Sequence, residues 1–170
     1  LSFLNKHELT DERWAENMRV PDSILSGGHS VACAYLQAFF QAEGCVRTKG
    51  NSSDITLVSI SKLLLEDIQH LLLNLGIFSR LMPSYEKRED RKPCYSLVIA
   101  YKSEREKFRS IIDFISQDKQ QKLWFTLQLP GKNIPPSRLE EITEIRSIGE
   151  FPVWDIETES HNYATNSIIV

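Results

Sequence analysis

The spacing of apolar positions predicts a helix that ends at Glu43. Ala34, Ala38 and Ala42 recur at every fourth residue, so on a helix they form one smooth stripe that a second helix can approach closely. The bulkier side chains are expected to point elsewhere, toward a core, and they are Tyr35, Leu36, Phe39 and Phe40. Gly44 is expected to end the helix in a left-handed conformation, which leaves the Glu43 carboxylate at the mouth of the helix pair. The same pattern also fits a buried amphipathic helix with an ordinary polar end.

The chain then changes from helical to strand periodicity and back. β-branched residues at 45–49 and 55–60, on either side of a polar segment with the composition of a turn, predict a hairpin. Ser61 is placed to cap a helix over residues 62–75, and Gly76 is placed to end it.

A second strand pair and a last helix complete this pattern. The strands are expected over 77–85 and 94–101, with a charged segment between them. Ser103 is expected to cap the last helix, whose apolar face runs from Phe108 to Ile115. The predicted order is therefore αββαββα.

A boundary follows. Residues 129–136 form a proline-rich connector, and the sequence after it favours strands over 142–147, 153–157 and 167–170. These strands are too few to bury a core of their own. We therefore expect them to complete a sheet whose other strands come from outside this segment.

Composition limits the class of protein. The 170 residues are 41% hydrophobic and 25% charged, which is enough for one core, and no apolar run approaches the roughly 18 residues of a membrane span. No signal segment is recognisable, so the expected location is the cytoplasm, without a membrane partner. The three cysteines lack metal-ligand spacing. A net charge of -3 counts against nucleic-acid binding unless positive charge is concentrated on one part of the surface.

Residues 36–44 resemble the signature helix of the LAGLIDADG homing endonucleases, with Glu43 at the metal-binding acid position. Gln37, Gln41 and Glu43 stand where the signature reads Ala, Asp and Asp. The resemblance implies that two such helices pair and that their acids hold Mg²⁺ at the scissile phosphates of a double-stranded DNA target. Residues 19–22 resemble the block before the second signature helix, which implies a first endonuclease half upstream of Leu1.

In that family the strands form a saddle over the DNA major groove, and side chains on its concave face reach phosphates and base edges. The implied DNA-binding residues are Arg47, Lys49, Arg80, Lys87, Arg88, Arg91 and Lys92. Without the signature helix, the same charges read as a solvated hairpin surface.

Residues 153–170 resemble the C-terminal splicing block of inteins, which reads aromatic-Asp-aliphatic, then His-Asn-aromatic, then an aliphatic strand. The resemblance assigns Asp155 to support of the N-terminal acyl shift and His161 to acid–base assistance of asparagine cyclisation, with no cofactor. Alone, they would read as an edge-strand aspartate and a turn histidine. The sequence stops one step before the asparagine that cyclises, and it lacks the nucleophile of the first step.

Together these features predict an α+β fold: a LAGLIDADG αββαββα saddle followed by C-terminal strands of an all-β intein (Hint) splicing domain. The expected parts are a connector from the missing first half (1–29), the endonuclease half-domain (30–125), a linker (126–140) and the splicing-domain portion (141–170). The chain is then the C-terminal part of an intein, whose partners are DNA, the N-terminal intein fragment or first endonuclease half, and the host extein. The alternative is a non-cleaving LAGLIDADG-fold nucleic-acid-binding protein, a maturase or a regulator.

Overall fold

The computed structural model describes residues 15–50, 52–84 and 92–130, together with 144–147, 149–150, 152, 164–165 and 168–169. The chain divides into two compact units, Leu1–Pro135 and Pro136–Val170, which are described separately. Within the described residues, no helix is long and apolar enough to cross a membrane.

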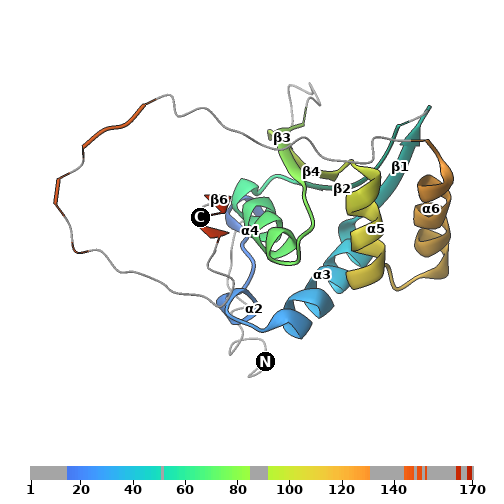
Figure 1. The fold of residues 1–170 in the computed structure, drawn as a ribbon, viewed down its shortest axis with the longest axis horizontal. Coiled ribbons are helices and arrows are strands. Elements are labelled where there is room, and N and C mark those ends of the chain that lie inside the picture. The colour runs from blue at the N-terminus through green and yellow to red at the C-terminus, as the bar shows by residue number, and fades with distance from the viewer. Residues whose placement is uncertain are drawn as a thin grey trace. The chain divides into compact units, whose positions relative to one another are not determined.

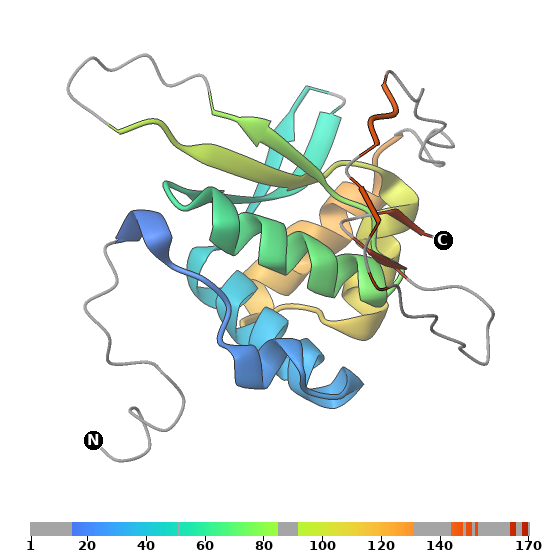
Figure 2. The same cartoon turned by 90° about the vertical axis from the view of Figure 1, so that its left-hand side faces the viewer.

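The first unit contains a four-stranded sheet with helices packed on one side (Figures 1 and 2). Its elements in chain order are η1 (Ala15–Asn17), α2 (Asp22–Leu25), α3 (His29–Glu43), β1 (Cys45–Lys49), β2 (Ser52–Ser59), α4 (Lys62–Asn74), β3 (Arg80–Pro83), β4 (Tyr95–Ile99), α5 (Lys102–Ile111) and α6 (Gln117–Gln128). The strand order is β1-β2-β4-β3, and each neighbouring pair is antiparallel. The αββαββα order is therefore present over α3–α5, and an additional helix, α6, follows it.

The two faces of the sheet differ in chemistry. Ile55 pairs with Ile99 and Leu57 with Leu97, and each of the four is at most 1% exposed and belongs to the hydrophobic core. Because successive side chains on a strand point to opposite faces, these residues define the face that packs against the helices. The residues between them, including Thr56 on β2, lie on the other face.

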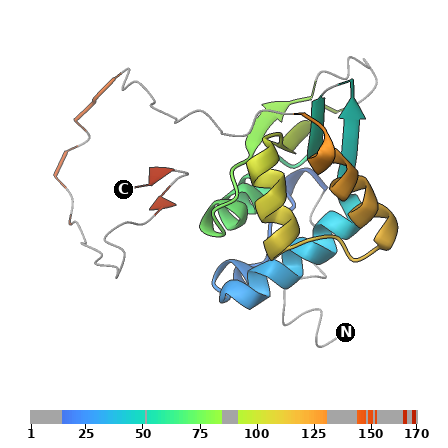
Figure 3. The ribbon, with the colours of Figure 1, turned by 45° about the vertical axis from the view of Figure 1, so that its right-hand side comes forward.

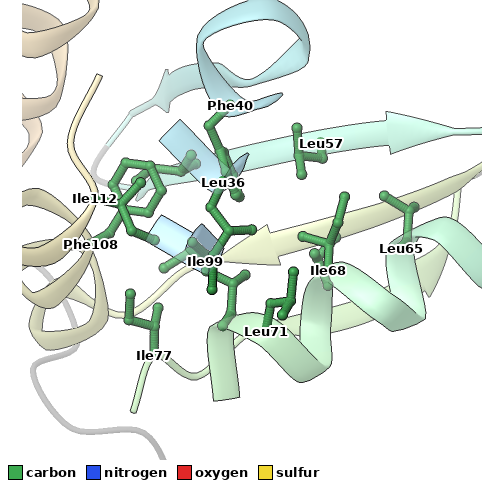
Figure 4. Close-up of a cluster of buried hydrophobic side chains, with 14 of the residues drawn as sticks. Leu36, Phe40, Leu57, Leu65, Ile68, Leu71, Ile77, Ile99, Phe108 and Ile112 are labelled. Carbon is green, nitrogen blue, oxygen red and sulfur yellow. The ribbon is translucent and has the colours of Figure 1, made fainter. Parts of the chain in front are cut away.

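The core lies between this face and the helices α3, α4 and α5 (Figure 4). Leu36 and Phe40 enter it from α3, and the Phe40 ring meets Phe108 of α5 edge-on with 4.8 Å between centroids. Phe114, which follows α5, packs on Phe108 at 5.3 Å. Such aromatic contacts add to the stabilisation from apolar burial.

Both predicted ends of α4 are confirmed. The Ser61 hydroxyl accepts a hydrogen bond from the Leu64 amide at 3.2 Å and so caps the helix. At the other end Gly76 has a φ of 72°, and the amides of Gly76 and Ile77 donate to the carbonyls of Leu73 and Leu72. This is the Schellman pattern, which requires the left-handed conformation that glycine adopts without strain.

The segment that precedes α2 is anchored on α4. Asp67 of α4 is 3% exposed, and its carboxylate accepts from Arg19 Nε at 2.9 Å, from Arg19 Nη2 and from the Val20 amide at 3.2 Å. The hydrogen bond and charge of Asp67 raise the pKa of Arg19. A buried carboxylate needs such partners, so this ion pair explains why a basic residue stands before Pro21 in the block noted from sequence.

The prediction of a left-handed Gly44 is wrong. Gly44 has a φ of -77° and a ψ of 140°, which is extended backbone. A Cβ at this position would lie 2.5 Å from the Phe40 carbonyl oxygen, so close approach of the chain, rather than a positive φ, requires glycine here. The hairpin turn is also tighter than predicted. Residues 52–54 belong to β2, because they pair with residues 47–49 of β1.

The end of the domain also differs from the prediction. Tyr101 rather than Ser103 is the N-cap residue of α5, and the Ser103 hydroxyl donates to Glu104. Ile115 is 61% exposed and lies beyond α5, which ends at Ile111. Helix α6 was not predicted; it is capped by Ser116, packs beside α5 and β1 (Figure 3), and includes residues 126–128 of the expected linker.

Little of the second unit is described. Residues 144–147, where a strand was expected, are not in a strand. Ala164–Thr165 (β5) pairs antiparallel with Ile168–Ile169 (β6), which falls within the strand expected over 167–170. The strand expected over 153–157 lies outside the described residues.

Two leucines of α4 test the position of the core. Leu65→Ala should lower the free energy of unfolding by about 2–5 kcal/mol, because Leu65 is 0% exposed and its truncation leaves a cavity. Leu63→Ala, the same change on the same helix at a side chain that is 41% exposed, should cost less than about 1 kcal/mol. Denaturant unfolding measures both, and equal losses would contradict this assignment of the buried face.

Candidate nucleic-acid interface

Helix α3 has one buried side and one exposed side. Ala32, Leu36 and Phe40 are buried, whereas the alanine stripe of residues 34, 38 and 42 is exposed, as predicted from its spacing. Val31, one turn before Ala34, is 40% exposed and extends the same surface. This side of the helix is therefore smooth, apolar and uncovered by the rest of the first unit's described residues.

Two glutamines fix one flank of α3. The Gln37 amide donates to the Ile112 carbonyl at 2.7 Å. The Gln41 carbonyl oxygen accepts from the amides of Ile115 and Ser116, both at 3.0 Å. Gln37 and Gln41 were noted from sequence as departures from the LAGLIDADG signature. The structure gives them a role, since they attach α3 to the connection between α5 and α6.

Glu43 is the last residue of α3, and its side chain is exposed. Among the described residues, the Glu43 carboxylate makes no hydrogen bond and no ion pair. Gly44 follows it, buried, with its amide bonded to the Phe40 carbonyl at 2.9 Å, and Cys45 begins β1. The free carboxylate thus lies where the exposed side of α3 meets the first strand of the sheet.

A lysine that sequence reasoning missed occupies the same helix end. Lys119 of α6 donates from Nζ to the carbonyl oxygens of Gln41 at 2.6 Å, Gly44 at 2.7 Å and Phe40 at 3.4 Å. These carbonyls carry the negative end of the α3 dipole, so the ammonium group is stabilised there. No sequence signal identified this contact, because Lys119 lies in a helix that the pattern did not predict.

The outer face of the sheet, opposite the core, carries three of the predicted DNA-binding residues. Val46 and Leu81 pack against the core, so their neighbours Arg47 on β1 and Arg80 on β3 point to the outer face. Lys49 shares the face of Arg47 by the same alternation, and all three basic residues are exposed. Arg47 and Lys49 lie on one edge strand and Arg80 on the other, so the outer face carries exposed positive charge at both edges of the sheet.

These basic residues differ in their partners. Arg47 donates from Nε to Asp54 at 2.8 Å, across the strand pair. Lys92 lies before β4 and is paired with Glu16 of η1. Within the described part of the chain, Lys49 and Arg80 have no side-chain partner. The other residues predicted as functional lie outside the described residues, and they are Lys87, Arg88, Arg91, Asp155 and His161.

A metal ion at the end of α3 would need oxygen, nitrogen or sulfur donors from the protein. The described residues contain no group of three or more His, Cys, Asp or Glu side chains that could hold a metal ion. Glu43 supplies a single carboxylate. Mg²⁺ is commonly bound by one or two carboxylates with water and substrate phosphates. Glu43 therefore fits one ligand of a shared Mg²⁺ site, and the first unit's described residues do not form a complete one.

Substitution of two lysines of α6 distinguishes the effect of capping α3 from the effect of losing a surface charge. Lys119→Met should lower the free energy of unfolding by about 1–2 kcal/mol, because it removes three hydrogen bonds to the end of α3. It should also speed hydrogen exchange of the Gly44 amide. Lys122→Met removes only an exposed ion pair with Asp118 and should cost less than about 1 kcal/mol. Unchanged Gly44 exchange in Lys119→Met would contradict the capping role.

Most of the chain is similar to segments of larger proteins. It is 29% identical over 169 residues to the ribonucleoside-diphosphate reductase NrdEB subunit alpha of Bacillus subtilis (strain 168), covering 89% of this chain and 16% of that protein. It is 30% identical over 159 residues to the isomerizing glutamine–fructose-6-phosphate aminotransferase of Methanocaldococcus jannaschii, covering 90% and 14%. It is 26% identical over 144 residues to the probable translation initiation factor IF-2 of Thermococcus kodakarensis, covering 85% of this chain and 12% of that protein.

The chain thus spans about one sixth or less of the length of these relatives. A family match covers the part of the chain that contains α3, the sheet and most of the helices around it. Residues 30–113 match the family described as a LAGLIDADG-like domain. The mixed helix-and-sheet fold with a four-stranded antiparallel sheet is compatible with that family. Residues 30–113 are therefore a LAGLIDADG-like domain.

Proposed function

We propose that this chain is the C-terminal part of an intein, and that its LAGLIDADG-like domain is one half of a metal-dependent homing endonuclease that cleaves double-stranded DNA. The observation that carries the nuclease proposal is the exposed side of α3. A smooth stripe of alanines ends there in a free carboxylate, Glu43. LAGLIDADG domains are typically nucleases, and this arrangement supplies the acid that such chemistry uses.

The alanine stripe supports pairing with a second helix. Interaxial distances between packed helices are about 8–10 Å, and the smallest distances require small side chains at the contact. Ala34, Ala38 and Ala42 meet this condition, and together with Val31 they form an apolar surface that pairing would bury. The partner in this proposal is the first endonuclease half or a second copy of the domain.

Pairing would bring two acids to the same place. Glu43 would then supply one ligand, and a matching acid of the partner another, with DNA phosphate oxygens completing the set. Mg²⁺ bound there would supply electrostatic stabilisation of the attacking and leaving oxygens at the scissile phosphate. Lys119 would hold the end of α3 in place through its hydrogen bonds to the Gln41 and Gly44 carbonyls. The outer face of the sheet would bind the DNA.

The relatives support the intein part of the proposal. Their names describe a reductase subunit, an aminotransferase and an initiation factor, whereas the shared segment is only 12–16% of each protein. One segment cannot perform three unrelated activities, so a self-contained inserted element is the simplest account of its recurrence. The His-Asn-Tyr block at residues 161–163 adds a sequence argument for splicing, with Asp155 and His161 in the roles that the intein resemblance implies.

The nuclease proposal predicts a strong effect at one carboxylate. Glu43→Gln, in the chain joined to its first endonuclease half, should lower cleavage of DNA that lacks the insertion by at least about a hundredfold, because a metal ligand is lost. DNA binding should remain. Glu106→Gln changes an exposed glutamate on α5 and should leave cleavage unchanged. Undiminished cleavage by Glu43→Gln would contradict the assignment, and binding without cleavage by the unmodified protein would favour a maturase or regulator.

The splicing proposal predicts two separable defects. The test protein is the chain extended by His-Asn and an extein nucleophile, mixed with the matching N-terminal fragment. His161→Ala should slow C-terminal cleavage by about 10²–10⁴-fold through loss of acid–base assistance, and leave the first acyl shift largely intact. Asp155→Ala should impair the earlier steps, so different species accumulate on a gel. An unchanged product pattern in both variants would show that the splicing block was misread.

A further inference from the structure

An arginine on the outer face of the sheet is held by a carboxylate on the neighbouring strand. Arg47 of β1 lies directly opposite Asp54 of β2, and Arg47 Nε donates to Asp54 Oδ1 at 2.8 Å. The Thr56 hydroxyl donates to the same oxygen at 2.5 Å. Two donors from different residues therefore fix the Asp54 carboxylate, and the carboxylate in turn fixes the arginine.

The nitrogen of Arg47 that bonds to Asp54 determines which donors remain for a ligand. Because Nε makes the bond to Asp54, both terminal amino groups of the guanidinium remain, and within the described residues they have no acceptor. The Arg47 side chain is 49% exposed, so these donors can reach a ligand, whereas the Asp54 side chain is 23% exposed. The guanidinium is thus oriented on its inner edge and available on its outer edge.

This arrangement matches one base pair better than the others. In the DNA major groove, guanine presents two acceptors, N7 and O6, which suit the parallel donors of a guanidinium. Adenine presents one acceptor and one donor, and the donor would oppose the guanidinium. The second oxygen of Asp54, to which no described group donates, suits the amino group of the paired cytosine and disfavours an acceptor at that place.

We propose that Arg47 reads the guanine of a G·C pair in the major groove and that Asp54 sets this preference, by orienting Arg47 and by facing the paired cytosine. The proposal rests on the proposed function, in which the outer face binds double-stranded DNA. Thr56, which is 2% exposed, acts through Asp54 and does not contact the DNA.

Lys49 provides the contrast on the same strand and the same face. Its side chain is exposed and has no partner among the described residues, and an ammonium group on a flexible stem acts as a point charge. Lys49 should therefore contact phosphate, which gives affinity without sequence preference.

The test uses the full chain and a library of duplex DNA with randomised sequence, from which bound molecules are selected and sequenced. The unmodified chain should enrich guanine at one position. Asp54→Ala should lower that preference about tenfold while affinity for duplexes without guanine stays equal or rises, because a negative charge leaves the DNA-facing surface. Asp54→Asn keeps an acceptor oxygen and should restore most of the preference. Arg47→Ala should lose the preference together with affinity.

Lys49→Ala should weaken binding uniformly across sequences, lower its salt dependence and keep the guanine preference.

Melting temperatures of all variants identify any loss of folding, which would lower affinity and preference together in Asp54→Ala. Full guanine preference in either Asp54→Ala or Arg47→Ala overturns the inference. Duplex binding by the unmodified chain with no base preference overturns the inference and leaves the proposed function standing. Absence of duplex binding at low salt overturns the inference, and the same absence in the chain joined to its first endonuclease half overturns the proposed function as well.

Discussion

The two-sided burial of α3 is the constraint on which the rest of the molecule depends. Leu36 and Phe40 anchor one side of the helix in the core, where Phe40 meets Phe108. The opposite side, with its alanines, is then left outside the domain. A helix rotated by half a turn would bury the alanines and expose Leu36 and Phe40, at a cost of several kcal/mol in lost apolar burial. The core therefore fixes both the surface available for pairing and the direction of the helix end.

Polar contacts from the following helices then fix the end of α3. Gln41 binds the amides of Ile115 and Ser116, and Lys119 binds the carbonyls of Gln41 and Gly44. These interactions join the last turn of α3 to α6 and satisfy backbone groups that a helix end leaves unpaired. Glu43 is the residue that these contacts omit. Its carboxylate is consequently free, at the exposed end of a helix whose position these contacts fix.

The positions of the charged side chains matter more for nucleic-acid binding than the net charge of the chain. The net charge is -3, yet Arg47, Lys49 and Arg80 all lie on one face of the sheet because strand alternation and register place them there. Their acidic partners are few and specific. Asp54 bonds one arginine and orients it, whereas Lys49 and Arg80 have no side-chain partner among the described residues. A surface of this kind can supply both sequence preference and general affinity.

Periodicity in the sequence was sufficient for the features that depend on near neighbours. The alanine spacing predicted the exposed stripe of α3, and Ser61 and Gly76 predicted both ends of α4, because caps and faces are set by residues within one turn. Sequence failed at Gly44, where the constraint is the distance to the Phe40 carbonyl rather than a dihedral angle. It also missed α6, whose apolar residues do not share one face: Leu123 and Leu127 are buried, whereas Trp124 and Phe125 are exposed. The tertiary structure alone decided that Lys119 meets the end of α3, that Gln41 holds Ser116 and that Asp67 anchors Arg19. Those pairs are separated by roughly 50 to 80 positions, and only packing of the core brings such polar groups within hydrogen-bonding distance.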